Sequence, residues 1–172
     1  MIGLIQHNAR ELRERHEAIH TAYRTRSVSK ENWSAWTQAC EEFHSSYDRL
    51  AFPGGLKRAY ELLKQRDISI VEPVIAFLEA DPYFFRSGYI KADFLRALPK
   101  FPLDNQQRVR LQEVILDRLQ GPRRREFRKY CNLAPYVSTA LFEQKVAALT
   151  NDRNEAVARS ANWVLVALRR KS

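Results

Sequence analysis

Glycine is scarce in this chain, with five residues in 172. They are scattered along it as Gly3, Gly54, Gly55, Gly88 and Gly121. These glycines never form the patterns GxxxxGK or GxGxxG, whose loops hold nucleotide phosphates through backbone amides. The sequence therefore argues against a nucleotide-hydrolysing enzyme.

Cysteine is scarcer still, and both residues, Cys40 and Cys131, lie in helical patterns among apolar neighbours. A free thiol in such a setting behaves as a small buried hydrophobe and is generally inert. We expect both cysteines to be reduced, with no disulfide and no cysteine nucleophile.

Long apolar runs are also missing. No stretch of about 18 apolar residues offers a membrane span, and the N-terminal sequence MIGLIQHNARELRER lacks the apolar core of a signal peptide. We therefore expect a cytoplasmic protein that makes no membrane contact.

Strand patterns are absent as well, because apolar residues recur at a helical spacing of three or four along nearly the whole chain. The clearest such stripe comprises Trp33, Trp36, Cys40, Phe43, Tyr47 and Leu50. With 45% hydrophobic residues and no low-complexity linker, the sequence predicts one all-α domain over residues 1–172.

Turn and cap residues divide the chain into nine predicted helices. Ser29 has the position of an N-cap for the aromatic helix, and the Pro53-Gly54-Gly55 cluster marks its end. The helix before it spans residues 4–25, with inward residues at Ile5, Leu12, Ile19 and Tyr23. The later helices are predicted at 55–65, 70–80, 87–98, 105–120, 123–136, 139–149 and 153–170. Their caps are expected at Asp67 or Ser69, Asp104, Ser138 and Asp152.

Three segments share a pattern of a breaker or cap, an apolar residue, an arginine and an apolar helix. They are DPYFFRSGYIKADFLRAL (81–98), GPRRREFRKYCNLAPYV (121–137) and DRNEAVARSANWVLVAL (152–168), and their arginines are Arg86, Arg128 and Arg159. The third segment resembles the Asp…Val-Arg…Ala…Leu pattern of HEAT repeats through Asp152, Val157, Arg159, Ala161 and Leu168. The first two are also similar to segments of small bacterial helical proteins of unknown function.

The resemblance to HEAT repeats covers about residues 68–172 and implies an α-solenoid of stacked antiparallel helix pairs. On this reading residues 1–52 form a helical hairpin that caps HEAT-like helices in residues 55–172. Arg86, Arg128 and Arg159 would then be structural arginines that pair with acidic residues of neighbouring units.

The stretch HEAIH, His16 to His20, matches the HExxH pattern in which two histidines bind zinc and a glutamate acts as base. That enzyme class also needs a third ligand and an upstream sheet, for which the fifteen preceding residues leave no room. Pairing Glu17-x-x-His20 with Glu41-x-x-His44 imitates a di-iron bundle, but matching carboxylates on long third and fourth helices are missing. We expect no catalysis, metal or other cofactor, and interpret His16, His20 and His44 as histidines bordering an apolar face.

The net charge of +9 is concentrated near the C-terminus. Residues 121–172 carry eleven Lys/Arg and four Asp/Glu, whereas residues 1–50 carry seven of each. Such a field favours acidic partners, whether phosphate backbones or acidic protein faces.

The run GPRRREFRKYC (121–131) divides by role when it is projected as a helix beginning at residue 123. Its apolar residues face the core, and its exposed cations are the candidates for partner contact: Arg123, Arg124, Arg125 and Lys129. Three arginines in a first turn oppose the helix dipole, and a bound anion would relieve that repulsion.

The aromatic group DPYFFRSGY (81–89) is the other candidate contact surface. Phe85 and Tyr89 are expected in the core, whereas Tyr83 and Phe84 are expected to be partly exposed beside the arginines.

The favoured function is a non-catalytic protein-binding module that docks an acidic protein partner, and a toxin-neutralising immunity-type protein is one version of it. The alternative is a nucleic-acid-binding HEAT-like protein that uses its basic C-terminal third. Neither hypothesis involves a small-molecule substrate.

Overall fold

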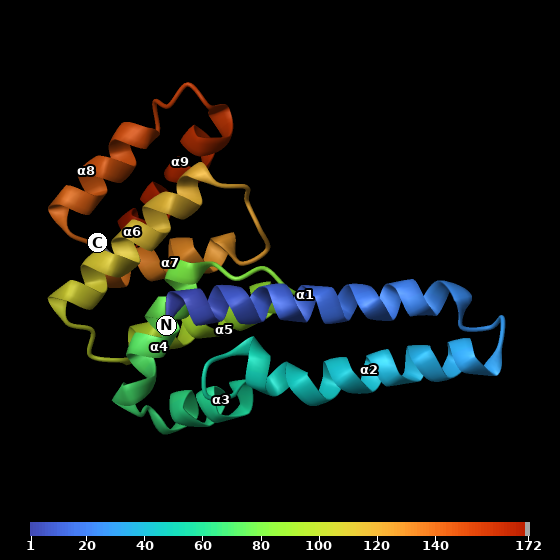
Figure 1. Cartoon of the computed structure of the whole chain (residues 1–172). Coiled ribbons are helices and arrows are strands. Elements are labelled where there is room, and N and C mark those ends of the chain that lie inside the picture. Colours follow the sequence, from blue (N-terminus) through green and yellow to red (C-terminus); the bar gives the residue numbers. More distant parts are fainter. Residues whose placement is uncertain (171–172) are drawn as a thin grey trace. The chain divides into compact units, whose positions relative to one another are not determined.

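The computed structural model describes residues 1–170, in which every regular element is helical (Figure 1). The expected all-α class is confirmed over these residues. The chain divides into two compact units, Met1–Ser87 and the residues from Gly88 onward. Residues 55–87 therefore group with the N-terminal hairpin, whereas the sequence had suggested a division between residues 52 and 55. Within the described range, no helix is both long and apolar enough to cross a membrane.

The first unit begins with two long helices, α1 (Ile2–Thr25) and α2 (Lys30–Ala51). Ser29 caps α2 as predicted, because its hydroxyl accepts a hydrogen bond from the Asn32 amide at 3.2 Å. The predicted turn after α2 is also confirmed. Gly54 and Gly55 have φ values of 83° and 95°, which a residue with a side chain rarely adopts.

Three shorter elements complete this unit: α3 (Leu56–Gln65), the 3-10 turn η1 (Ile68–Ile70) and α4 (Val71–Ala80). Asp67 caps η1 by accepting a hydrogen bond from the Ser69 amide. Helix α4 is almost wholly buried, and Val74, Ile75 and Phe77 have no exposed surface. It packs against α1, so it belongs to the core of this unit.

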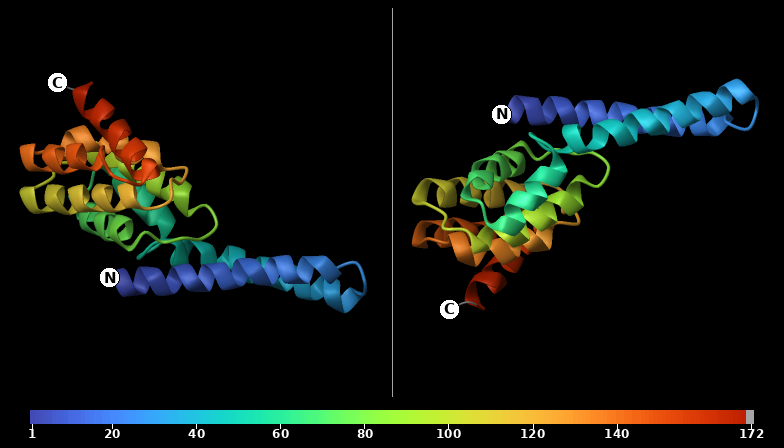
Figure 2. Two further views of the ribbon diagram at one scale, coloured as in Figure 1. Left: turned by 90° about the horizontal axis from the view of Figure 1, so that it is seen from above. Right: turned by 90° about the horizontal axis from the view of Figure 1, so that it is seen from below.

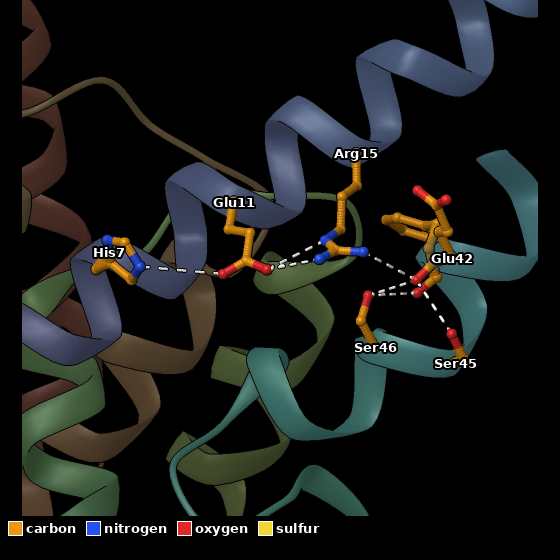
Figure 3. A network of polar contacts seen from close by, with 7 residues as sticks. His7, Glu11, Arg15, Glu42, Ser45 and Ser46 are labelled. Atoms are coloured by element: carbon orange, nitrogen blue, oxygen red, sulfur yellow. Dashed lines mark hydrogen bonds and ion pairs between the residues drawn. The ribbon is translucent and has the colours of Figure 1, made fainter.

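Helices α1 and α2 lie side by side along their length as a hairpin (Figure 2). A polar contact joins them: the Arg15 guanidinium, which pairs with Glu11 of its own helix at 2.8 Å, donates a hydrogen bond to the Glu42 carbonyl of α2 at 3.4 Å (Figure 3). The buried residues lie before residue 13 in α1 and after residue 42 in α2: Ile5, Asn8, Ala9, Leu12, Phe43, Ser46, Leu50 and Ala51.

The distal half of the hairpin contradicts two expected core positions. Tyr23 is 48% exposed and Trp33 54% exposed, and they pack at the edges of Trp36. Helical period identifies the apolar face correctly, but two helices alone cannot bury aromatic rings this large. The stripe is therefore a core at its Phe43 end and a surface at its Trp33 end.

The second unit contains most of α5 (Ser87–Ala97), then η2 (Leu98–Lys100), α6 (Asn105–Gln120), α7 (Phe127–Val137), α8 (Ala140–Leu149) and α9 (Glu155–Arg169). Helix α7 packs against α6 and α9, and α8 packs against α9. The predicted inner face of α7 is confirmed, since Phe127, Tyr130 and Cys131 are buried, together with Ala134 and Val137.

Cap positions in this unit are partly as predicted. Asp104 caps α6 and forms a reciprocal capping box with Gln107. Ser138 and Asp152 are not the caps of the last two helices; Thr139 caps α8 and Asn154 caps α9. The capping side chain must sit in extended backbone directly before the first helical turn, and those two residues meet that requirement.

Helix α7 begins four residues later than the sequence predicted, at Phe127. Arg123 and Arg124 precede it in non-helical backbone, and a turn closes when the Phe127 amide donates to the Arg124 carbonyl at 3.0 Å. The three arginines are therefore not in a first helical turn, and the predicted conflict with the helix dipole does not arise there.

Candidate functional site: an arginine-rich surface of the second unit

An open depression on the second unit collects most of the predicted contact residues. Its lining residues are Arg123, Arg124, Arg125, Phe127, Arg128 and Trp163. The four arginines come from the loop before α7 and from the first turn of α7, whereas Trp163 comes from α9. The fold thus adds an aromatic residue to the basic cluster that the sequence had identified.

Trp163 is the centre of this arrangement. Its side chain is 40% exposed, and the guanidinium carbons of Arg123 and Arg128 lie 5.2 and 5.7 Å from the centre of its ring. The Phe127 ring packs beneath at 6.0 Å between centroids. A guanidinium this close to an indole ring is attracted to it electrostatically, and it can still donate hydrogen bonds to another group.

Sequence reasoning did not single out Trp163. The helical spacing could have identified it. The buried residues of α9 include Val157, Ala161 and Val164, and position 163 lies outside the face that they form. A tryptophan at an exposed helical position is itself a reason to suspect an interface.

The first residues of α5 fix the arginine loop in place. The Lys91 ammonium pairs with the Glu126 carboxylate at 2.8 Å, and the two side chains are 1% and 4% exposed. A side chain on Gly88 would come within 2.9 Å of that carboxylate. Beside them, Arg125 stacks on the Tyr89 ring at 4.2 Å and hydrogen-bonds to the Tyr89 hydroxyl. Residues 88–91 therefore hold Arg125 and Glu126 through a close approach, an ion pair and a stacked ring.

Tyr89 does not have the core position expected for it, because its side chain is 48% exposed under Arg125. Glu126, in contrast, is a charged residue that is buried. Neither Lys91 nor Glu126 could be paired from the sequence, since no local pattern links positions so far apart.

Lys129 lies outside the arginine depression, in a second groove of the same unit. The lining residues of this groove are Leu95, Arg96, Pro99, Lys100, Lys129, Asn132, Pro135, Tyr136, Ala167 and Arg170. It begins where the depression ends, because Lys129 follows Arg128 on α7 and Ala167 lies one turn beyond Trp163 on α9. The two hollows share the seam between these helices.

The three arginines interpreted as structural lie at the surface. Arg128 rests on Trp163, and Arg159 pairs with Glu155 of its own helix at 3.9 Å, not with a neighbouring unit. Arg86 belongs to the first unit and is exposed, with a left-handed φ of 68°. A shared role for these arginines in a HEAT-like stack stays a prediction.

The aromatic group before α5 has its exposures reversed at two positions. Tyr83 is 60% exposed as expected, but Phe84 is buried beside Phe77, and Phe85 is 47% exposed. The exposures predicted from a helical projection are wrong here because this segment is a turn. Side chains of α2 and α1 donate hydrogen bonds to its backbone carbonyls. The Tyr47 hydroxyl donates to Phe85 at 2.8 Å, and Arg13 donates to Tyr83 at 3.3 Å.

Three histidines of the first unit, His16, His20 and His44, lie against other rings. His16 stacks on Phe85 at 4.8 Å and meets His20 edge-on at 4.6 Å, while His44 packs against Phe43 at 5.6 Å. Burial, and then the nearby charge of His20, lower the pKa of His16. In the part of the chain that the structure describes, no three His, Cys, Asp or Glu side chains are grouped so that they could hold a metal ion.

Both cysteines are free thiols. Cys40 is half-buried and Cys131 is buried. Burial raises the pKa of Cys131 to about 11, so this thiol stays protonated at neutral pH.

Comparison with known proteins gave no match. No family model, no curated protein and no solved structure is significantly similar to this chain.

Removing one partner of the buried ion pair should destabilise the second unit strongly. Lys91→Ala leaves the Glu126 carboxylate buried without its ammonium, and we expect a loss of about 3–5 kcal/mol in the free energy of unfolding. Urea denaturation followed by Trp163 fluorescence, in a Trp33→Phe/Trp36→Phe background, measures it. Lys91→Met/Glu126→Leu should recover most of the loss, since no charge is then left in the core. A loss below about 1 kcal/mol for Lys91→Ala would contradict this role.

The lowered pKa of His16 predicts a stability that depends on pH. A histidine whose pKa is lower in the folded state binds its proton more readily when unfolded, so stability falls as pH decreases through its unfolded value near 6.5. Thermal unfolding between pH 7.5 and 5.5 should show a smaller loss for His16→Gln than for the unaltered chain. His7→Gln, at a side chain that is 63% exposed, is the matched control and should keep the original slope. Equal slopes for all three proteins would refute the prediction.

Proposed function

We propose that this protein is a non-catalytic docking module whose second unit binds an acidic segment of a protein partner. The observation that carries the proposal is an open depression lined by four arginines and a partly exposed tryptophan, on which two of the arginines lie. A toxin-neutralising immunity-type protein is one specific version of such a module.

The electrostatics of the depression support an anionic ligand. Arg123, Arg124, Arg125 and Arg128 share one small surface, and like charges so close together repel one another. A carboxylate that binds between them removes this repulsion and can accept paired hydrogen bonds from a planar guanidinium. An acidic partner therefore stabilises the arrangement more than water does.

The tryptophan favours a protein over a nucleic acid. Trp and Arg are the residues most enriched among those that dominate protein interfaces. Base stacking requires an open aromatic face, whereas Arg123 and Arg128 both lie over the Trp163 ring.

Nucleic-acid binding is the second candidate, and a specific observation favours it. Residues 121–172 carry eleven Lys/Arg against four Asp/Glu, a balance that suits a phosphate backbone. The two candidates differ in the ligand that the arginine depression prefers.

Charge reversal in the depression tests the proposal. Arg123→Glu/Arg128→Glu replaces two exposed cations that lie on Trp163, and we expect it to weaken binding of a fluorescent Glu/Asp-rich peptide about tenfold or more. Lys145→Glu/Arg153→Glu makes the same change in net charge at exposed residues that do not line the depression, and should have little effect. Fluorescence anisotropy at a fixed salt concentration measures the affinity of each variant for the peptide.

Equal losses in the two variants would show that only net charge matters, and would contradict docking at the depression. Tighter binding of single-stranded DNA than of the peptide, with a salt dependence that falls by about one unit per removed cation, would establish the nucleic-acid alternative instead.

A further inference from the structure

The second groove continues the arginine depression along the same two helices. The depression takes Arg128 from α7 and Trp163 from α9, and the groove takes Asn132 and Tyr136 from α7 and Ala167 from α9. Within each helix these residues are spaced by four, so they lie on one face. The two hollows therefore form one path along the α7–α9 seam.

The path carries positive charge from end to end. Beyond the four arginines of the depression, the groove adds Arg96, Lys100, Lys129 and Arg170. One of these cations, Arg96, forms an exposed ion pair with Asp93 at 2.9 Å. Charge complementarity over this length favours a ligand with several negative charges in a row.

The groove differs from the depression in its apolar lining. Leu95, Pro99, Pro135, Tyr136 and Ala167 make up half of its lining residues. Phosphates gain nothing from such a surface, whereas an apolar side chain does. Between the cations, the Asn132 amide has both a donor and an acceptor, which match the N–H and C=O of a peptide group.

The length of the path sets the size of the ligand. From Arg128 to Tyr136 on α7, and from Trp163 to Arg170 on α9, the helices rise roughly 10–12 Å at about 1.5 Å per residue. An extended peptide covers that distance with about four residues at roughly 3.3 Å each. The arginine loop before α7 and the groove residues from α5 and η2 extend the contact to roughly six to eight residues.

From these observations we infer that the partner binds as an extended acidic segment with at least one apolar side chain, which lies along the α7–α9 seam from the depression into the groove. This inference rests on the docking function proposed above. It specifies the shape and chemistry of the bound segment, and it assigns to the groove the role of a second subsite.

A peptide-length series tests the inference on the full chain. The probes are fluorescent Glu/Asp peptides of four and eight residues, the longer with a central leucine. We expect the eight-residue peptide to bind about tenfold or more tightly than the four-residue peptide, because a four-residue peptide centred on the arginine loop ends before the groove, whereas the longer one occupies both subsites.

Charge reversal in the groove then separates the two subsites. Lys100→Glu/Arg170→Glu changes two exposed groove residues, and it should reduce the affinity for the eight-residue peptide to about that of the four-residue peptide. The shorter peptide should be unaffected. Lys145→Glu/Arg153→Glu again serves as the charge-matched control, and circular dichroism verifies that each variant is folded.

The outcomes distinguish the inference from the function on which it rests. If Lys100→Glu/Arg170→Glu binds both peptides normally while Arg123→Glu/Arg128→Glu loses them, the docking function stands and the second subsite is wrong. If Arg123→Glu/Arg128→Glu also binds normally, the docking function fails.

Replacing the central leucine by serine should weaken binding of the longer peptide severalfold, and equal affinity would refute the apolar part of the inference. Preferential binding of oligothymidylate with a steep salt dependence would overturn the inference that the ligand is a protein segment.

Discussion

The buried ion pair between Lys91 and Glu126 is the constraint on which the candidate site depends. Its two charges are 2.8 Å apart and almost completely removed from water, so separating them would leave an uncompensated charge in the core. Gly88 allows this geometry because any side chain there would collide with the carboxylate. The pair ties the start of α5 to the residue that immediately precedes α7, and so it determines where the arginine loop lies.

The basic residues on either side of Glu126 have different contacts because the ion pair fixes the position of this segment. Arg125, next to Glu126, stacks on Tyr89. Arg123, which precedes Glu126 in the sequence, and Arg128, which follows it, both lie on Trp163. Lys129, one residue further, turns into the adjoining groove. The run GPRRREFRKYC thus contains one buried anchor, one buried apolar face and basic residues that line two adjacent hollows. An anionic segment that follows the α7–α9 seam would contact both hollows.

The first unit shows a different balance between packing and exposure. Its hairpin is buried where α1 meets α4, and its aromatic side chains become progressively exposed toward the turn that joins the two helices. His16, Phe43 and Phe85 form an aromatic cluster near the middle of the hairpin, where burial and then the nearby charge of His20 lower the pKa of His16. The HEAIH stretch thus contributes ring contacts to the surface of the hairpin.

Local patterns in the sequence determined the helical class, the turn at Pro53-Gly54-Gly55, the caps at Ser29 and Asp104, and the inner face of α7 around Phe127, Tyr130 and Cys131. Each of these depends on residues within one or two turns of one another, so their spacing is sufficient evidence. Burial and pairing are not local. Whether Trp33 or Phe84 is covered depends on which other element packs there, and the Lys91–Glu126 and Arg128–Trp163 contacts join residues that are 35 positions apart in the sequence. Only the tertiary structure could place those side chains together, because the free energy of burying a charge or a ring depends on the whole environment into which it is moved.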